Sequence, residues 1–273
     1  MKRLRKSAAP RRFTHSLQLT MRKAIRFTLA CVLLACSQTA AGETTAPLAR
    51  SHQLVVVTTR GWDDVPGTLR RLERKGSRGA WAQVGVDVPV AVGRKGLGWG
   101  AGLVDTSAAA GPQKKEGDGK APAGLFRLGP AFGFAPGRAA WLRFPYVPLT
   151  PSVECVDDTA SRHYNLIVDR FAVGDFDWNS SERMRSVEGY RWGLVVRHNA
   201  APTVAGRGSC IFLHVWAGPG QGTAGCTALE EEKLTELLRW LDPKKVPLLV
   251  QLPEGEYARL HAAWRLPALD LDE

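Results

Sequence analysis

From Gln53 onward, short apolar runs alternate with glycine- and proline-rich breaks, and this alternation favours short strands joined by turns. Residues 54–58 read LVVVT, which is typical of a buried strand, and Gly61 and Pro66-Gly67 follow as turn signals. Further strand candidates lie at 68–72, 80–84, 88–92, 125–128, 191–198 and 246–252. We therefore predict one mostly β domain over residues 51–260, a β-sandwich of two mixed sheets with few short helices. A C-terminal tail follows at 261–273, with a short closing helix beyond Glu256 and a loose end at 269–273.

One stretch has a helical period instead. Leucines recur at spacings of three to five residues from Leu229 to Leu241, and Asp242-Pro243 is a signal that ends a helix. Residues 227–230, Thr-Ala-Leu-Glu, have the form of a capping box, and three consecutive glutamates suit the positive end of a helix. We therefore expect a helix that begins directly after Cys226 and runs to about Trp240.

The segment at 209–229, SCIFLHVWAGPGQGTAGCTAL, places an imidazole and a thiol at the two ends of one loop. Its apolar start leads to His214, a glycine-rich bend follows, and Cys226 comes directly before the expected helix. An imidazole and the positive end of a helix both favour a thiolate, so the pattern indicates a cysteine nucleophile with His214 as its base. Backbone N–H groups at Gly225 and Cys226 would then hold the oxyanion. In the other interpretation, Cys226 is a small buried hydrophobe and His214 is structural.

The same segment resembles the L,D-transpeptidase catalytic domain (YkuD-type), in which a histidine on a strand precedes a Ser/Thr-His-Gly-Cys loop that carries the nucleophile. Thr223, Gly225 and Cys226 match this loop, and His214 matches the upstream base. Ala224 stands where a second histidine is usual. The pattern GS-x-IFLH followed by T-x-GC-x-AL is similar to a divergent branch of that family.

A second segment adds to the resemblance. Family members commonly enter a strand with T-P-x-G-x-F, and residues 121–126 read APAGLF, so Pro122, Gly124 and Phe126 match. We expect this turn to belong to the scaffold. Ala228 replaces the family's usual Asn or Arg, and this departure leaves the substrate and the reaction subtype open.

The resemblance implies acyl transfer on peptidoglycan stem peptides, without a cofactor. In that chemistry the Cys226 thiolate attacks the carbonyl that precedes a terminal D-Ala and forms a thioester, which an amine of another stem peptide or water resolves. A hydrolase of the same fold, either an L,D-carboxypeptidase or an amidase, differs only in the acceptor. A non-catalytic cell-wall-binding lipoprotein is the alternative from another class of protein.

Other residues are candidates for the walls of a substrate groove. Tyr164, Asn165 and Tyr190 lie in segments that also resemble the divergent branch, although each could equally pack or hydrogen-bond around the sheet. His163 and His198 could compete with His214 as the base. Neither lies on the strand that leads into the cysteine loop, so His214 is preferred.

Residues 1–42 differ from the rest of the chain because they carry nine Lys and Arg residues and no acid. The apolar run from Phe27 to Ala35 is too short to span a bilayer, so the segment is predicted to be a secretory signal, with a possible true start at Met21. Residues 33–36, LLAC, resemble a bacterial lipobox that would leave Cys36 lipidated, whereas cleavage near residues 40–42 would leave a soluble form. Either way we expect export to the periplasm or cell envelope, with the membrane reached only through Cys36.

Export also changes what charge and cysteine content imply. The formal charge of +11 falls to +2 once the nine basic residues of the signal are subtracted, so no nucleic-acid partner is expected. Three cysteines remain beyond the signal, and an odd number in an oxidising compartment implies one disulfide and one free thiol. With Cys226 as the free thiol, Cys155 and Cys210 are expected to pair. No Cys or His cluster has the spacing of metal ligands, so no metal is expected.

Overall fold

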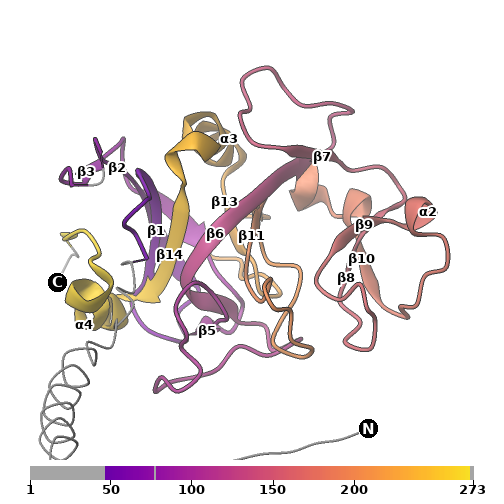
Figure 1. Ribbon diagram of the computed structural model, residues 1–273, viewed down its shortest axis with the longest axis horizontal. Helices are drawn as coiled ribbons and strands as arrows, with labels where there is room; N and C mark the ends of the chain where they lie inside the picture. The colour runs from indigo at the N-terminus through magenta and orange to yellow at the C-terminus, as the bar shows by residue number, and fades with distance from the viewer. Residues whose placement is uncertain (1–46, 77, 271–273) are drawn as a thin grey trace, which may run out of the picture. The chain divides into compact units, whose positions relative to one another are not determined.

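A computed structural model describes residues 47–76 and 78–270, which pack as one compact unit (Figure 1). The predicted signal segment at 1–42, including the possible lipidation site Cys36, lies outside the described residues. None of the helices in the described part is long and apolar enough to cross a bilayer.

Most strands belong to one 11-stranded mixed sheet. Its central strands follow the order β1-β14-β6-β11-β12-β13-β4-β2, and β2 pairs with β1 again, so the sheet closes on itself. The strands are β1 (Gln53–Thr59), β2 (Pro66–Glu73), β3 (Ala82–Gln83), β4 (Val88–Ala91), β5 (Leu97–Trp99), β6 (Ala121–Gly133), β7 (Tyr146–Pro148), β11 (Trp192–Val196), β12 (Phe212–Val215), β13 (Thr227–Leu229) and β14 (Leu248–Pro253). Closure leaves no free edge along the main ring.

A smaller sheet holds the strands β8 (Val153–Val156), β9 (Ile167–Asp169) and β10 (Ser181–Arg183), which pair antiparallel. Figure 1 shows it beside the large sheet, on the side of β11 rather than of β1. The predicted mostly β class, with two sheets and few helices, is confirmed. The structure refines the expected sandwich of two mixed sheets, because the mixed sheet closes into a barrel and the second sheet is purely antiparallel.

The core explains why these segments form strands. Every residue of β1 and of β14 is buried, as their near-continuous apolar sequences require for strands covered on both faces. Burying one such side chain contributes about 1.5–3 kcal/mol. A second, smaller cluster of buried side chains joins the barrel to the small sheet, and it contains Phe132, Cys155, Tyr190, Phe212 and Cys226. The candidate nucleophile therefore lies in the packed junction between the two sheets.

The helices are few and short. They are α2 (Arg170–Val173), α3 (Glu231–Trp240) and α4 (Glu254–Trp264), with 3-10 turns η1 (Met184–Ser186), η2 (Glu188–Arg191) and η3 (Pro243–Lys245). The predicted helix after Cys226 exists as α3, but its start was placed too early. Residues 227–229 form β13, where the Thr227 hydroxyl donates to Gln251 Oε1 at 2.6 Å instead of capping a helix. Burial of all three β13 residues between β12 and β4 outweighs the local helical preference.

The end of the packed region also differs from the prediction. Helix α4 continues past residue 260 to Trp264, and Leu266 is only 5 % exposed. The Tyr257 hydroxyl donates to the Pro267 carbonyl at 2.8 Å. Helix α4 thus crosses the predicted boundary at residue 260, and Trp264 and Leu266 of the predicted tail belong to the buried core.

Candidate functional site

The pairing of β12 with β13 brings the two sequence candidates together. These strands are parallel neighbours, with Leu213 opposite Thr227 and His214 opposite Ala228. Cys226 directly precedes β13, so it stands one position before the Leu213–Thr227 pair. The loop that separates His214 from Cys226 along the chain thus returns the thiol to the strand that carries the imidazole.

Thr223 braces the loop that carries the thiol. Its hydroxyl donates to the Cys226 carbonyl at 2.7 Å and accepts the Gly225 N–H at 3.1 Å. Two backbone hydrogen bonds, from Arg94 N–H to the Thr223 carbonyl and from Thr223 N–H to the Val92 carbonyl, fix the loop to the end of β4. The Gly225 N–H, which the sequence suggested as an oxyanion donor, is therefore already engaged by Thr223.

The Cys226 side chain is 6 % exposed and is held by two main-chain groups. The Phe212 N–H donates to its sulfur at 3.3 Å, and the thiol donates to the Cys210 carbonyl at 3.4 Å. Cys226 lies at a pocket of about 370 Å³. The charged residues that line this pocket are Lys114, Glu116, Asp157 and Glu182.

The electrostatics of the thiol differ from the expectation. Burial raises the pKa of Cys226 to about 12, and the negative charge of Glu182 adds to this effect. The Phe212 N–H, the charge of Lys114 and the Tyr190 hydroxyl act in the opposite direction. The expected contribution of a helix N-terminus is wrong, because β13 separates Cys226 from α3 and the field of a helix end does not extend beyond its first turn. The resting thiol is protonated at neutral pH.

Tyr190 connects the thiol to a buried carboxylate. Its hydroxyl donates to Glu182 Oε2 at 2.8 Å, and the same hydroxyl lies near the Cys226 sulfur, where it favours the thiolate. Burial raises the pKa of Glu182, while the Tyr190 hydrogen bond acts against that rise. The Tyr190 ring packs edge-on against Phe212 and His214, with ring centroids 5.4 and 5.2 Å apart. Tyr190 was a sequence candidate, but Glu182 was missed, because nothing in the polar run NSSERMRSVEGY distinguishes it from an exposed acid.

His214 is half-buried and its tautomer is set by the backbone. Its Nδ1 lies 2.8 Å from the Val215 carbonyl, which can only accept, so Nδ1 carries the proton and Nε2 is the acceptor. Burial lowers the pKa of His214, which keeps the imidazole neutral at neutral pH. Gly189 in η2 covers the ring, where a Cβ would come within 3.2 Å of Nδ1. Within the described residues, no hydrogen bond joins His214 to Cys226, and His214 does not line the cysteine pocket.

Tyr164 and Asn165 form hydrogen bonds to residues next to the cysteine pocket. The Tyr164 hydroxyl donates to Glu116 and accepts the Gly208 N–H, and burial raises the pKa of this phenol well above its usual value. The Asn165 side chain accepts the Cys210 N–H at 3.0 Å and donates to the carbonyls of residues 198 and 199. Neither residue lines the cysteine pocket, whereas Tyr190 does.

The two alternative bases lie elsewhere. His163 Nδ1 is 3.2 Å from Asp177, and its ring meets the Trp178 ring edge to face. His198 is 1 % exposed, its Nε2 lies 2.8 Å from the Arg207 carbonyl, and burial lowers its pKa to about 4. Neither of them lines the cysteine pocket.

Cys155 and Cys210 are joined by a disulfide, with their Cα atoms 5.9 Å apart. The bond connects β8 of the small sheet to the segment that enters β12, and the Cys210 carbonyl accepts the thiol hydrogen bond. Among the described residues, Cys226 is the free cysteine. The same part of the chain contains no group of three or more His, Cys, Asp or Glu side chains placed to hold a metal ion.

Comparison with known proteins shows which protein family has this sequence pattern. A family model for the L,D-transpeptidase catalytic domain matches residues 72–250, well over half of the chain and the whole of the cysteine loop. No curated protein and no solved structure matches the chain significantly. The family is one of peptidoglycan enzymes that use a cysteine, and the match extends from β2 to β14. The chain belongs to the L,D-transpeptidase catalytic domain family.

Proposed function

We propose that this protein is an exported cysteine acyltransferase that acts on peptidoglycan stem peptides, with Cys226 as the nucleophile and His214 as its base. The observation that carries the proposal is the free thiol at a preformed pocket, beside a strand that supplies a neutral imidazole. Family membership supports the substrate class. Export is inferred from the basic and apolar segment at residues 1–42.

A thiol with a pKa of about 12 requires a base during the attack itself. As the Cys226 sulfur bonds to the carbonyl carbon before a terminal D-Ala, its proton passes to His214 Nε2, which the Val215 carbonyl leaves free to accept. Collapse of the tetrahedral intermediate breaks the peptide C–N bond, and the imidazolium returns the proton to the departing D-Ala amine. The thioester remains on Cys226.

Substrate binding must redirect the thiol, which points to the Cys210 carbonyl in the free protein. A rotation about the Cα–Cβ bond of Cys226 exchanges this contact for one with His214, as catalytic hydrogen bonds often tighten only in the substrate complex. The Cys226 N–H is the donor that we assign to the oxyanion, because the Gly225 N–H is held by Thr223. Thr223 is thus a positioning residue that shapes the loop.

The second half-reaction decides between a transferase and a hydrolase. An amine of a neighbouring stem peptide attacks the thioester to form a cross-link, with its proton taken by His214. Water in the same place would give an L,D-carboxypeptidase. We favour the amine because the pocket is lined by three carboxylates, of Glu116, Asp157 and Glu182, which attract an approaching ammonium group.

Incubation of purified protein with tetrapeptide muropeptides, followed by mass spectrometry, tests the proposal. The wild-type protein should release D-Ala and form cross-linked dimers, Cys226→Ser should do neither, and His214→Ala should retain slow covalent labelling. Release of D-Ala without dimers would identify a carboxypeptidase. Unchanged conversion by the Cys226→Ser protein would refute the cysteine mechanism, and absence of any conversion by folded wild-type protein would favour a wall-binding role.

A further inference from the structure

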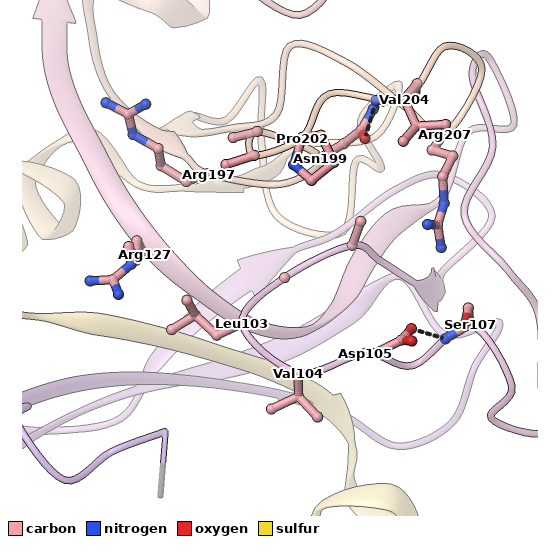
Figure 2. Close-up of a pocket in the computed structure, with 14 residues that line it drawn as sticks. Leu103, Val104, Asp105, Ser107, Arg127, Arg197, Asn199, Pro202, Val204 and Arg207 are labelled. Atoms are coloured by element: carbon pink, nitrogen blue, oxygen red, sulfur yellow. Dashed lines mark hydrogen bonds between the residues drawn. The ribbon is translucent and has the colours of Figure 1, made fainter. Parts of the chain in front are cut away.

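A second pocket, of about 760 Å³, lies between the segment at 101–107 and the loop at 199–207, and it shares no lining residue with the cysteine pocket (Figure 2). Three arginines line it, Arg127, Arg197 and Arg207, together with one carboxylate, Asp105. The lining therefore carries a formal charge of +2, whereas the charged residues of the cysteine pocket are three acids and one lysine, with a formal charge of −2.

Arg127 and Arg197 are neighbours at one end of this pocket. The Arg197 N–H donates to the Arg127 carbonyl at 2.9 Å, so the two side chains leave the barrel from adjoining positions. Figure 2 shows both guanidinium groups at the same end of the pocket. Both side chains are exposed, and neither forms an ion pair with a carboxylate in the described part of the chain. Two adjacent cations without a counter-charge attract an anion that can bridge them.

The other end of the pocket carries charges of both signs, those of Arg207 and Asp105. Asp105 accepts the Ser107 N–H at 2.9 Å, and this bond, together with the nearby charge of Arg207, lowers the pKa of the carboxyl. Leu103 and Val204 are large apolar side chains that remain 38 % and 42 % exposed. The pocket thus combines one anion-attracting end with apolar walls.

The wall of the pocket is preformed. Asn199 is 1 % exposed, and its side chain donates to the carbonyls of Val204 and Gly208 and accepts the Val204 N–H, so it holds the loop in one shape. Asn165 then links this wall to the cysteine site, because it bonds both the Asn199 carbonyl and the Cys210 N–H. A ligand meets an ordered surface and loses little free energy to ordering it.

We propose that this pocket binds a carboxylate group of the peptidoglycan polymer, outside the cysteine pocket, through Arg127 and Arg197. The identity of the polymer rests on the proposed function. Paired guanidinium groups match the two oxygens of a carboxylate, and the apolar walls accept the aliphatic part of a peptide. Arg207, at the other end of this pocket, is two residues from Ser209 of the cysteine pocket, so a stem peptide whose carboxylate is held by Arg127 and Arg197 can extend along the pocket toward the site of reaction.

The test uses protein carrying Cys226→Ser, so that binding is measured without turnover, and sedimentation with isolated sacculi as the probe. The double substitution R127Q/R197Q should weaken binding about tenfold at low ionic strength, the difference shrinking as salt is added. The matched control R50Q/R60Q removes two exposed arginines outside the pocket and should bind like the parent protein.

Chemical treatment of the sacculi separates the possible sources of the anion. Amidation of their carboxylates should weaken binding of the parent protein to the level of R127Q/R197Q, and removal of phosphate polymers with hydrofluoric acid should leave binding unchanged. Equal binding by R127Q/R197Q and the parent, dependence on phosphate, or no sedimentation of any variant would each overturn the inference. Turnover of soluble muropeptides is measured separately, so it can establish the proposed function whatever the result here.

Discussion

The charge of Glu182 should control how readily the Cys226 thiol ionises. Burial, with a contribution from that charge, raises the pKa of Cys226 from an ordinary 9.0 to about 12. At 1.36 kcal/mol per pKa unit, forming the thiolate costs about 4 kcal/mol more in the folded protein than in an exposed cysteine. Only about one molecule in 10⁴ therefore carries a thiolate at pH 8.

Two substitutions should move this equilibrium in opposite directions. Glu182→Gln removes the negative charge while its amide oxygen can still accept the Tyr190 hydroxyl, so the pKa of Cys226 should fall. Tyr190→Phe removes a hydrogen bond that stabilises the thiolate, so that pKa should rise. Glu188→Gln is the control, since Glu188 belongs to the neighbouring turn η2 and its side chain is 83 % exposed.

The assay is the rate of alkylation by iodoacetamide between pH 6 and pH 10, with the label located at Cys226 by peptide mass. The wild-type rate should rise about tenfold per pH unit without a plateau, because the thiolate fraction does so well below its pKa. At pH 8, Glu182→Gln should react several-fold faster than wild type, Tyr190→Phe more slowly, and the control at the wild-type rate. A wild-type plateau below pH 9, or shifts of the same sign in both variants, would refute the electrostatic reasoning.

Three further predictions concern stability and positioning. The Cys226 thiol keeps its proton in the folded protein above the pH at which the thiol of the unfolded chain loses it. The free energy of unfolding should therefore fall by up to about 4 kcal/mol as pH rises from 9 to 12. Urea titrations should show a smaller fall for Cys226→Ser. Replacing Cys155 and Cys210 by alanine should lower the free energy of unfolding by at most about 4 kcal/mol in denaturant titrations, since the disulfide joins residues 55 positions apart. Gly189→Ala should reduce muropeptide turnover but leave alkylation of Cys226 intact, because the added methyl group would lie 2.6 Å from the Val215 carbonyl oxygen, which holds His214 Nδ1. Equal losses in both assays would contradict this.

The buried strands could be predicted because strands in a protein core have characteristically apolar sequences. Strands β1 and β14 are covered on both faces, so their sequences are near-continuous apolar runs. Closure of the sheet could not be predicted, because it depends on pairings between strands far apart in the sequence, such as β1 with β14 and β13 with β4. The secondary structure of residues 227–229 could not be predicted either, since three buried residues fit a strand or the first turn of a helix equally well.

Some residues of the candidate site could be predicted from local sequence patterns, and others only from tertiary contacts. His214 and Cys226 could be found because a strand end and a glycine-rich loop have local signatures. Glu182 could not, because its proximity to the thiol arises from the small sheet packing against the barrel. Tyr164 and Asn165 were found as polar residues of interest, but only the structure distinguishes a supporting hydrogen bond from a groove wall.

Strand β12 positions the groups around the thiol, a role that the sequence pattern had suggested for the start of the helix α3. It carries His214, its Phe212 N–H holds the sulfur, and the Cys210 carbonyl just before it accepts the thiol. The disulfide ties this same segment to β8, so base, thiol anchors and small sheet are fixed relative to one another. A shift of β12 against β13 would disturb the thiol and the imidazole together. The carboxylates of the pocket lie on other segments, Glu182 on β10, Asp157 directly after β8 and Glu116 in a loop, so a substitution there can change the charge around the thiol without moving β12.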